Sequence, residues 1–195
     1  DGITAPGIRS LIRVMNSIGD VIVVAPDSPQ SAMGHAITIN NTLYCKKEHI
    51  DDGPQEEYST SGTPADCVKL AVHELLDRKP DLCVSGINHG SNSSINVIYS
   101  GTMSAAIEAG MSEIPAIGFS LLNYNWDADF SAAESYIKTL CLKVLEKGLQ
   151  KGIVLNVNVP NLAKKDIKGL KVCRQANATW VEKFDKRQSP MGRNY

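Results

Sequence analysis

The most widespread catalytic signatures are missing from this sequence of 195 residues. It has no G-x-x-x-x-G-K-[ST] phosphate loop, no G-x-G-x-x-G fingerprint and no G-x-S-x-G nucleophile elbow. Its four histidines show no H-E-x-x-H spacing, and its five cysteines form no C-x-x-C pair. These absences argue against P-loop, dinucleotide-binding, α/β-hydrolase and zinc chemistry. Hard oxygen groups remain as the main candidate chemistry.

The sequence also lacks an excess of one charge and lacks a long apolar run. Its 20 Lys and Arg residues balance 21 Asp and Glu residues, and no basic stripe is present, so we expect no binding to nucleic-acid duplexes. No apolar run is long enough to span a bilayer, so we expect no membrane association. The scattered cysteines indicate reduced thiols and predict a cytoplasmic location.

Two kinds of apolar pattern alternate along the first 163 residues. Residues 21–25 form a continuous apolar run, typical of a strand buried on both faces, and further strands are predicted at residues 82–84, 116–121 and 153–159. Apolar residues at helical spacing occupy residues 5–18, 63–75, 102–109 and 130–145. This alternation predicts an α/β fold with a three-layer, Rossmann-like, mostly parallel sheet and helices on both faces. Residues 1–4 have the character of a strand-to-helix loop, so we expect a strand to precede them. We expect residues 36–44 to form an edge strand or an extended arm.

The composition changes after residue 163, which divides an α/β core (1–163) from a C-terminal extension (164–195). The extension is polar and charged, with short β-like pieces at residues 170–172 and 178–181. We predict a β-hairpin or arm in which Val172, Trp180, Val181 and Phe184 are exposed. Pairing with another subunit would cover these side chains, so the extension is predicted to be an oligomerisation arm.

Small and amide residues follow the apolar run at 82–84, where open α/β sheets bind their ligands. Asn88 offers an amide oxygen, which is a hard ligand for a cation. Ser100, Gly101 and Thr102 offer hydroxyl and N–H groups at the start of a helix, which suits a phosphate. Taken alone, these residues are equally typical of ordinary turns and helix caps.

Four loops in order resemble those of the SurE family of survival proteins, which are metal-dependent 5'/3'-nucleotidases. The loops are residues 1–7, 25–31, 61–67, and 85–88 together with 99–102, and the match covers most of the chain. The resemblance implies an α/β core, a nucleoside monophosphate substrate and a homodimer or homotetramer. It also implies one divalent metal ion per subunit, Mg²⁺ or Mn²⁺.

The resemblance also assigns ligands to the metal. In the family the first loop reads Asn-Asp-Asp-Gly and both aspartates bind the metal, and Asp1 corresponds to the second of them. The family's serine and asparagine ligands correspond to Ser31 and Asn88. Two departures bear on the shape of the loops, because Ala32 and Ser94 stand where glycine is common in the family.

We therefore expect a phosphomonoesterase that hydrolyses nucleoside 5'- and 3'-monophosphates by a metal-activated water. Asp1 and Asn88 are the predicted catalytic residues, and the predicted phosphate ligands are Asn92, Ser100, Gly101 and Thr102. A non-catalytic nucleotide-binding stress-response module and a phosphatase of broader substrate, such as short polyphosphate, remain alternatives. No general acid is evident.

Three further polar residues are interpreted conservatively. Asp66 is a favourable acid for the first turn of a helix, so it is left out of the catalytic set. His35 and His89 are candidate substrate contacts, but a solvated position is favoured for each.

Overall fold

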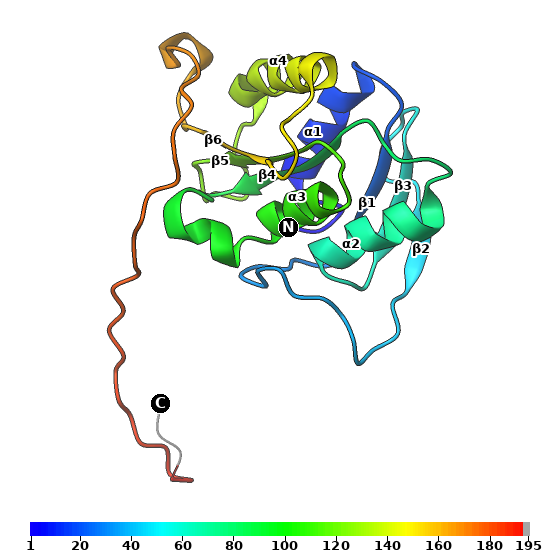
Figure 1. Ribbon diagram of the computed structural model, residues 1–195. Helices are drawn as coiled ribbons and strands as arrows, with labels where there is room; N and C mark the ends of the chain where they lie inside the picture. Colours follow the sequence, from blue (N-terminus) through cyan, green and yellow to red (C-terminus); the bar gives the residue numbers. More distant parts are fainter. Residues whose placement is uncertain (193–195) are drawn as a thin grey trace.

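The computed structural model describes residues 1–192, and six strands form its centre (Figure 1). One sheet has the order β1 (Ile22–Pro26), β3 (Glu56–Thr60), β2 (Cys45–Glu48). The other has the order β4 (Cys83–His89), β5 (Ala116–Leu121), β6 (Leu155–Val159). All neighbouring strands are parallel except β2, which runs antiparallel to β3. The predicted α/β class and the mostly parallel pairing are confirmed.

Helices cover both faces of this strand layer (Figure 1). On one side α1 (Pro6–Asn16) packs on β4 and on α4 (Ser131–Lys147). On the other side α3 (Gly101–Met111) packs on β4 and β5, and α2 (Pro64–Leu70) packs on β1 and α3. Three short helices complete the described elements: η1 (Ala71–Leu75), η2 (Ser94–Tyr99) and η3 (Lys164–Asp166). The three-layer prediction is confirmed.

Strand β5 is the centre of the largest apolar cluster. All six of its residues are buried, because β4 and β6 pair with its edges and helices cover its faces. Phe119 and Ile117 are completely buried and pack with Ile137 of α4 and Ile87 of β4. Burial on both faces explains why β5 is mostly apolar in the sequence, with Ser120 as its one polar residue.

Helix α1 fixes the position of β4 and of β3. A Cβ atom at Gly7 would overlap the carbonyl oxygen of Ile87, so glycine is required for this close approach of helix and strand. Two residues later, Nη1 of the buried Arg9 lies 2.8 Å from Oε2 of Glu57, which is also buried. Helix α1 therefore contacts both sheets, β4 through Gly7 and β3 through Arg9.

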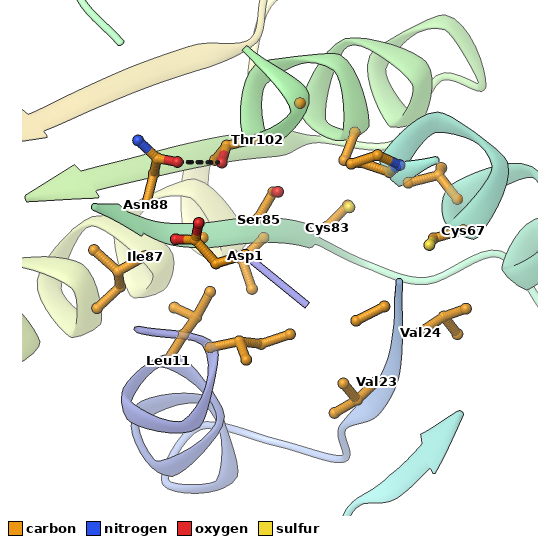
Figure 2. Close-up of a pocket in the computed structure, with 18 of the residues that line it drawn as sticks. Asp1, Leu11, Val23, Val24, Cys67, Cys83, Ser85, Ile87, Asn88 and Thr102 are labelled. Carbon is orange, nitrogen blue, oxygen red and sulfur yellow. Dashed lines mark hydrogen bonds between the residues drawn. The ribbon is translucent and has the colours of Figure 1, made fainter. Parts of the chain in front are cut away.

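The edge strands β1 and β4 of the two sheets border a groove of about 1280 Å³. Apolar side chains line most of the groove, among them Leu11, Val23 and Ile87 (Figure 2). Polar side chains gather at one end of the groove, beyond the carboxyl ends of β1 and β4. This end holds the candidate site.

Two segments for which β structure was predicted contain no strand; for residues 36–44 this rules out the edge strand and leaves the extended arm. Residues 36–44 form neither helix nor strand, and residues 167–187 form an extended chain without helix or strand (Figure 1). The predicted C-terminal hairpin is therefore not confirmed, and Val172, Val181 and Phe184 are 90%, 95% and 84% exposed. A two-stranded hairpin with nothing to pack against is only marginally stable, which accounts for the difference. No helix within residues 1–192 is both long and apolar enough to cross a membrane.

Candidate functional site

All the predicted site residues line the polar end of one groove. They come from the loop before α1, the loop after β1, the end of β4 and the start of α3: Asp1, Ser31, Asn88, Asn92, Ser100, Gly101 and Thr102. Parallel strands end at the same edge of a sheet, so segments far apart in sequence meet there. The structure therefore brings together the predicted metal ligands and the predicted phosphate ligands.

The side-chain amide of Asn88 has a defined orientation. Its Nδ2 donates hydrogen bonds of 2.9 Å to the carbonyl oxygens of His89 and Gly90. Its Oδ1 accepts a hydrogen bond of 3.4 Å from the hydroxyl of Thr102 (Figure 2). Because both amide hydrogens are used by the backbone, the oxygen is the atom that faces the groove and the start of α3.

Asp1 is held by His89. The Nδ1 atom of His89 lies 2.9 Å from Oδ2 of Asp1, and the backbone N–H of His89 donates to the same oxygen over 3.4 Å. The imidazole is stacked on Trp126 and meets Phe130 edge-on, and only 9% of its side chain is exposed. The solvated position favoured for His89 from sequence is therefore wrong.

Burial also affects the charge of this histidine. Desolvation lowers the pKa of His89 and so disfavours the imidazolium form. In the tautomer that carries its proton on Nδ1, the ring donates that proton to the carboxylate of Asp1. His89 thus fixes the direction of the Asp1 side chain, a role that the sequence showed only through its position next to Asn88.

The start of α3 supplies hydrogen-bond donors to the same end of the groove. Ser100 is the N-cap, and its Oγ accepts from the backbone N–H of Met103 over 3.0 Å. A Cβ atom at Gly101 would lie 3.1 Å from Cγ of Pro64 and 3.4 Å from the carbonyl oxygen of Gln30. Glycine therefore lets the helix start close to the loop that carries Ser31. The first N–H groups of a helix have no intrahelical acceptor and favour an anion.

Asn92 is buried and anchors the loop after β4. Its Nδ2 donates to Oγ of Ser120 over 2.8 Å, and its backbone N–H donates to Oδ1 of Asn158 over 2.9 Å. Its carbonyl oxygen accepts from Nδ2 of Asn156 over 2.8 Å. Strands β5 and β6 thus hold this loop in place, which the sequence did not indicate. A contact between Asn92 and phosphate stays a prediction.

Ser31 lies on an exposed loop, residues 27–38, which we call the Ser31 loop. The loop has no helix or strand, but His35 anchors it through Nε2, 2.7 Å from Oε2 of the buried Glu108 on α3. The other carboxylate oxygen of Glu108 lies 2.9 Å from Nζ of Lys69 on α2. His35 is therefore a structural contact between the loop and the helices and is only one-third exposed.

Asp66 provides the second anchor of the Ser31 loop. Its carboxylate accepts hydrogen bonds from the backbone and the hydroxyl of Thr38, at 3.1 and 2.6 Å, and from the backbone of Thr63 at 2.9 Å. With Thr63 it completes a capping box at the start of α2. Burial opposes the charge on this carboxylate, but these hydrogen bonds outweigh it and lower the pKa of Asp66. The structural interpretation of Asp66 fits these contacts.

The donor set at the polar end fits a hard divalent cation. Asp1, Ser31 and Asn88 offer carboxylate, hydroxyl and amide oxygens, as Mg²⁺ or Mn²⁺ requires. Within residues 1–192 no cluster of three His, Cys, Asp or Glu side chains could hold a metal in another way. Arg78 is the only Arg or Lys among the described residues that line the groove, and it is paired with Asp81 before β4 begins. A phosphate at the site therefore needs positive charge from another source.

The thiols of the groove are not nucleophiles. Cys67 and Cys83 line the groove, and burial raises the pKa of Cys67 strongly and that of Cys83 to about 12. Both thiols are protonated at neutral pH, which removes the reactive thiolate. All five cysteines are free, as the sequence predicted.

This fold and this site define an α/β protein whose oxygen donors and helix N-terminus meet at the carboxyl edge of a parallel sheet, as in phosphate-binding proteins. The family model described as Survival protein SurE matches residues 1–182. The chain belongs to the SurE family.

Relatives and a solved structure agree with this assignment. The chain is 67% identical to the 5'-nucleotidase SurE of Flavobacterium psychrophilum over 195 residues, which are all of this chain and 76% of that protein. It is 68% identical to the protein of the same name from Flavobacterium johnsoniae, again over the whole chain and over 75% of that protein. The crystal structure of the SurE protein from Aquifex aeolicus superposes with a TM-score of 0.85 at 38% identity, covering all of this chain and 77% of that one.

Proposed function

We propose that the protein is a 5'-nucleotidase that hydrolyses nucleoside 5'-monophosphates, and also 3'-monophosphates, to nucleoside and phosphate. The names of its relatives support a nucleotidase. The observation that carries the proposal is the convergence of Asp1, Ser31 and Asn88 with the start of α3 in one groove. This arrangement supports a cation site beside donors for a phosphate.

Asp1, Ser31 and Asn88 would hold one divalent cation, Mg²⁺ or Mn²⁺. Such a cation supplies Lewis-acid polarisation of phosphoryl oxygens and a more acidic water. The protein supports these ligands in advance. His89 fixes the carboxylate of Asp1, and two backbone carbonyls fix the amide of Asn88. Ligands held in place need no reorganisation when the charge of the transition state develops.

The start of α3 would bind the phosphoryl group. The N–H groups of Gly101 and Thr102 and the hydroxyl of Ser100 can donate to its equatorial oxygens, where charge accumulates during in-line displacement. The hydroxyl of Ser100 remains able to donate, since its bond to Met103 uses only the oxygen as an acceptor. These donors orient phosphorus for attack by water opposite the ribose oxygen.

A phosphate-release assay tests the proposal. The purified protein is incubated with the common nucleoside 5'-monophosphates, their 3' isomers and short polyphosphate, with chelator and with added Mg²⁺ or Mn²⁺. We expect release from monophosphates that stops in chelator and returns with metal. Binding without release would indicate the nucleotide-binding module. Faster release from polyphosphate would indicate a broader phosphatase, and full activity after exhaustive chelation would refute the metal assignment.

We also propose that the C-terminal extension serves oligomerisation. Its apolar side chains are exposed on a chain that projects from the core, with Trp180 59% and Phe184 84% exposed (Figure 1). Covering them against a second subunit would remove this apolar surface from water. Light scattering at micromolar concentration should give at least a dimer mass. A monomer mass would contradict the proposal.

A further inference from the structure

The loop between β5 and α4, residues 122–130, presents two aromatic rings beside the candidate site. We propose that the exposed faces of Tyr124 and Trp126 bind the nucleobase of the substrate. This inference rests on the proposed nucleotidase function and extends it to the part of the substrate that does not react. It concerns residues outside the predicted metal and phosphate ligands.

Tyr124 joins the loop to the site directly. It lines the same groove as Asn88 and Asn92, and 76% of the residue is exposed. Its ring lies over Gly90, where an added Cβ atom would overlap the ring carbons. Its hydroxyl accepts from the backbone N–H of Ser91 over 3.4 Å. The ring is thus seated on the segment that follows Asn88, with most of its surface open to solvent.

Trp126 reaches the site through His89. One face of its indole lies parallel to the His89 imidazole, at 5.6 Å between ring centroids and an interplanar angle of 9°. The edge of the same imidazole contacts Asp1 through Nδ1, so only the His89 ring lies between the indole and a predicted metal ligand. Trp126 is still 60% exposed. An indole supported on one face and open on the other is suited to stacking against a planar base.

The charges of the loop favour a base over a second phosphate. Residues 122–130 contain no Lys or Arg and carry two carboxylates, at Asp127 and Asp129. A further phosphate would therefore gain no cationic partner and would meet negative charge. Every nucleobase has a π-face, so stacking needs no charge and tolerates different bases. The occupant that fits both the rings and the charges is the base of a nucleoside monophosphate.

The loop is anchored at both ends, so the rings are held near the site before substrate binds. The backbone N–H of Leu122 donates to the carbonyl of Val159 over 2.9 Å. Phe130 is buried in the main apolar cluster. Between them Asn125 donates to Oδ1 of Asn123 over 3.0 Å. Holding a binding surface in its bound form reduces the entropy lost on association.

Steady-state kinetics with two substrates tests the inference. Adenosine 5'-monophosphate carries a base and ribose 5-phosphate does not, while both carry the same phosphate and sugar. Tyr124→Ala and Trp126→Ala should each raise KM for adenosine 5'-monophosphate by about 5- to 100-fold, the range measured for loss of a base-stacking ring. Their kcat/KM for ribose 5-phosphate should change less than about twofold, within the range for a surface substitution. Trp126→Phe should restore part of the loss.

Tyr44→Ala is the matched control, because Tyr44 is 72% exposed and lies before β2, away from this loop. It should leave KM for both substrates unchanged. Equal losses on both substrates would overturn the inference, since Trp126 would then act only through His89 and Asp1. Unchanged KM for adenosine 5'-monophosphate in both alanine variants would overturn it as well.

A binding measurement separates this inference from the proposed reaction. The chain has two tryptophans, so Trp180→Phe leaves Trp126 as the only indole. Adenosine should quench the fluorescence of this variant at saturating concentration, and ribose 5-phosphate should not. Quenching without any turnover would refute the proposed nucleotidase activity but support the proposed nucleobase site. Turnover without quenching would keep the nucleotidase and refute the base site.

Discussion

Replacement of Asp66 by alanine would test whether this buried carboxylate is structural. The side chain is 3% exposed and accepts from three donors: the backbone N–H of Thr63 and both the N–H and the hydroxyl of Thr38. The first bond belongs to the capping box of α2, and the other two hold the Ser31 loop. Alanine removes every acceptor at once and leaves the donors in place.

The expected loss follows from the burial of these donors. The N–H of Thr63 is buried, and an unpaired buried donor costs about 1 to 3 kcal/mol, with the larger values for bonds to a charged group. Thr38 is only half-buried, so water can replace part of its two bonds. We expect Asp66→Ala to lower the free energy of unfolding by about 3 to 5 kcal/mol. In a chain of this size that is a fall in Tm of about 6 to 20 °C.

Urea unfolding followed by circular dichroism measures this difference. Asp66→Asn is the control, because its amide keeps one carbonyl oxygen as an acceptor, and it should lose less stability than the alanine variant. Two results would refute the reasoning. One is a loss below about 1 kcal/mol for Asp66→Ala, the size of an ordinary surface substitution. The other is an Asp66→Asn variant with native stability and no activity, which would place Asp66 in the reaction.

Three further predictions concern the candidate metal ligands, the packing of α1 and the pH dependence of stability. Ser31→Ala and Asn88→Ala should lower kcat by at least about 100-fold, because both are proposed to act at the reacting phosphate. The Tm should be nearly unchanged for Ser31→Ala, which lies in an exposed loop, and should fall only modestly for Asn88→Ala, which loses two hydrogen bonds at the end of β4. Activity losses that only follow unfolding would contradict the ligand assignment. Gly7→Ala should lower the free energy of unfolding by about 1 to 3 kcal/mol or more, because the added Cβ would overpack against Ile87. Gly19→Ala is the control: an added Cβ there has no neighbour within 4 Å, so stability should be unchanged or slightly raised. Equal shifts of the urea midpoint in both variants would refute the close-packing argument. Burial opposes the charge on Glu108, but hydrogen bonds from His35 and Lys69 lower its pKa overall. The contribution of Glu108 to the free energy of unfolding is therefore present above about pH 4.3 and is lost as the pH falls further. Glu108→Gln should flatten the acid side of a plot of stability against pH.

The core strands could be predicted because burial on both faces leaves a direct record in the sequence. Strand β1 is a continuous apolar run and β5 is mostly apolar, and the structure has both within about one residue of the predicted bounds. Strand β2 has no apolar run that could reveal it in the sequence. It is a polar strand with three exposed residues, paired only with β3 on the surface of the protein.

Of the two predictions for residues 36–44, an edge strand or an extended arm, the strand is wrong for a related reason. Ile37 and Ile39 alternate with polar residues, which is the pattern of a half-buried strand. Both isoleucines are exposed, at 47% and 78%, and the segment is held by the bonds from Thr38 to Asp66 instead of by a strand ladder. A contact between residues 28 positions apart leaves no local pattern that could reveal it.

The site was predictable as a set of loops and not as a set of contacts. The order of the loops, through their resemblance to those of the SurE family, indicated Asp1, Ser31 and Asn88 as candidate ligands. The pairing of His89 with Asp1 spans 88 positions, and the bond from Asn92 to Ser120 spans 28. Such partners depend on strand order and register, which single-sequence patterns do not contain. The same limit hid the aromatic loop, because Trp126 lies near the site only through its stacking on His89.

The two sides of the candidate site therefore differ in how they are supported. Asn88 ends a strand of the core, whereas the Ser31 loop is held by the carboxylates of Asp66 and Glu108. Because hydrogen bonds lower the pKa of both carboxyl groups in spite of burial, both anchors weaken as the pH falls below about 4. Local opening needs less free energy than global unfolding, so acid should release this loop first. Hydrogen exchange should show the Thr38 amide losing protection at a higher pH than the amide of Phe119, and simultaneous loss at both amides would mean that the loop and the core unfold as one unit.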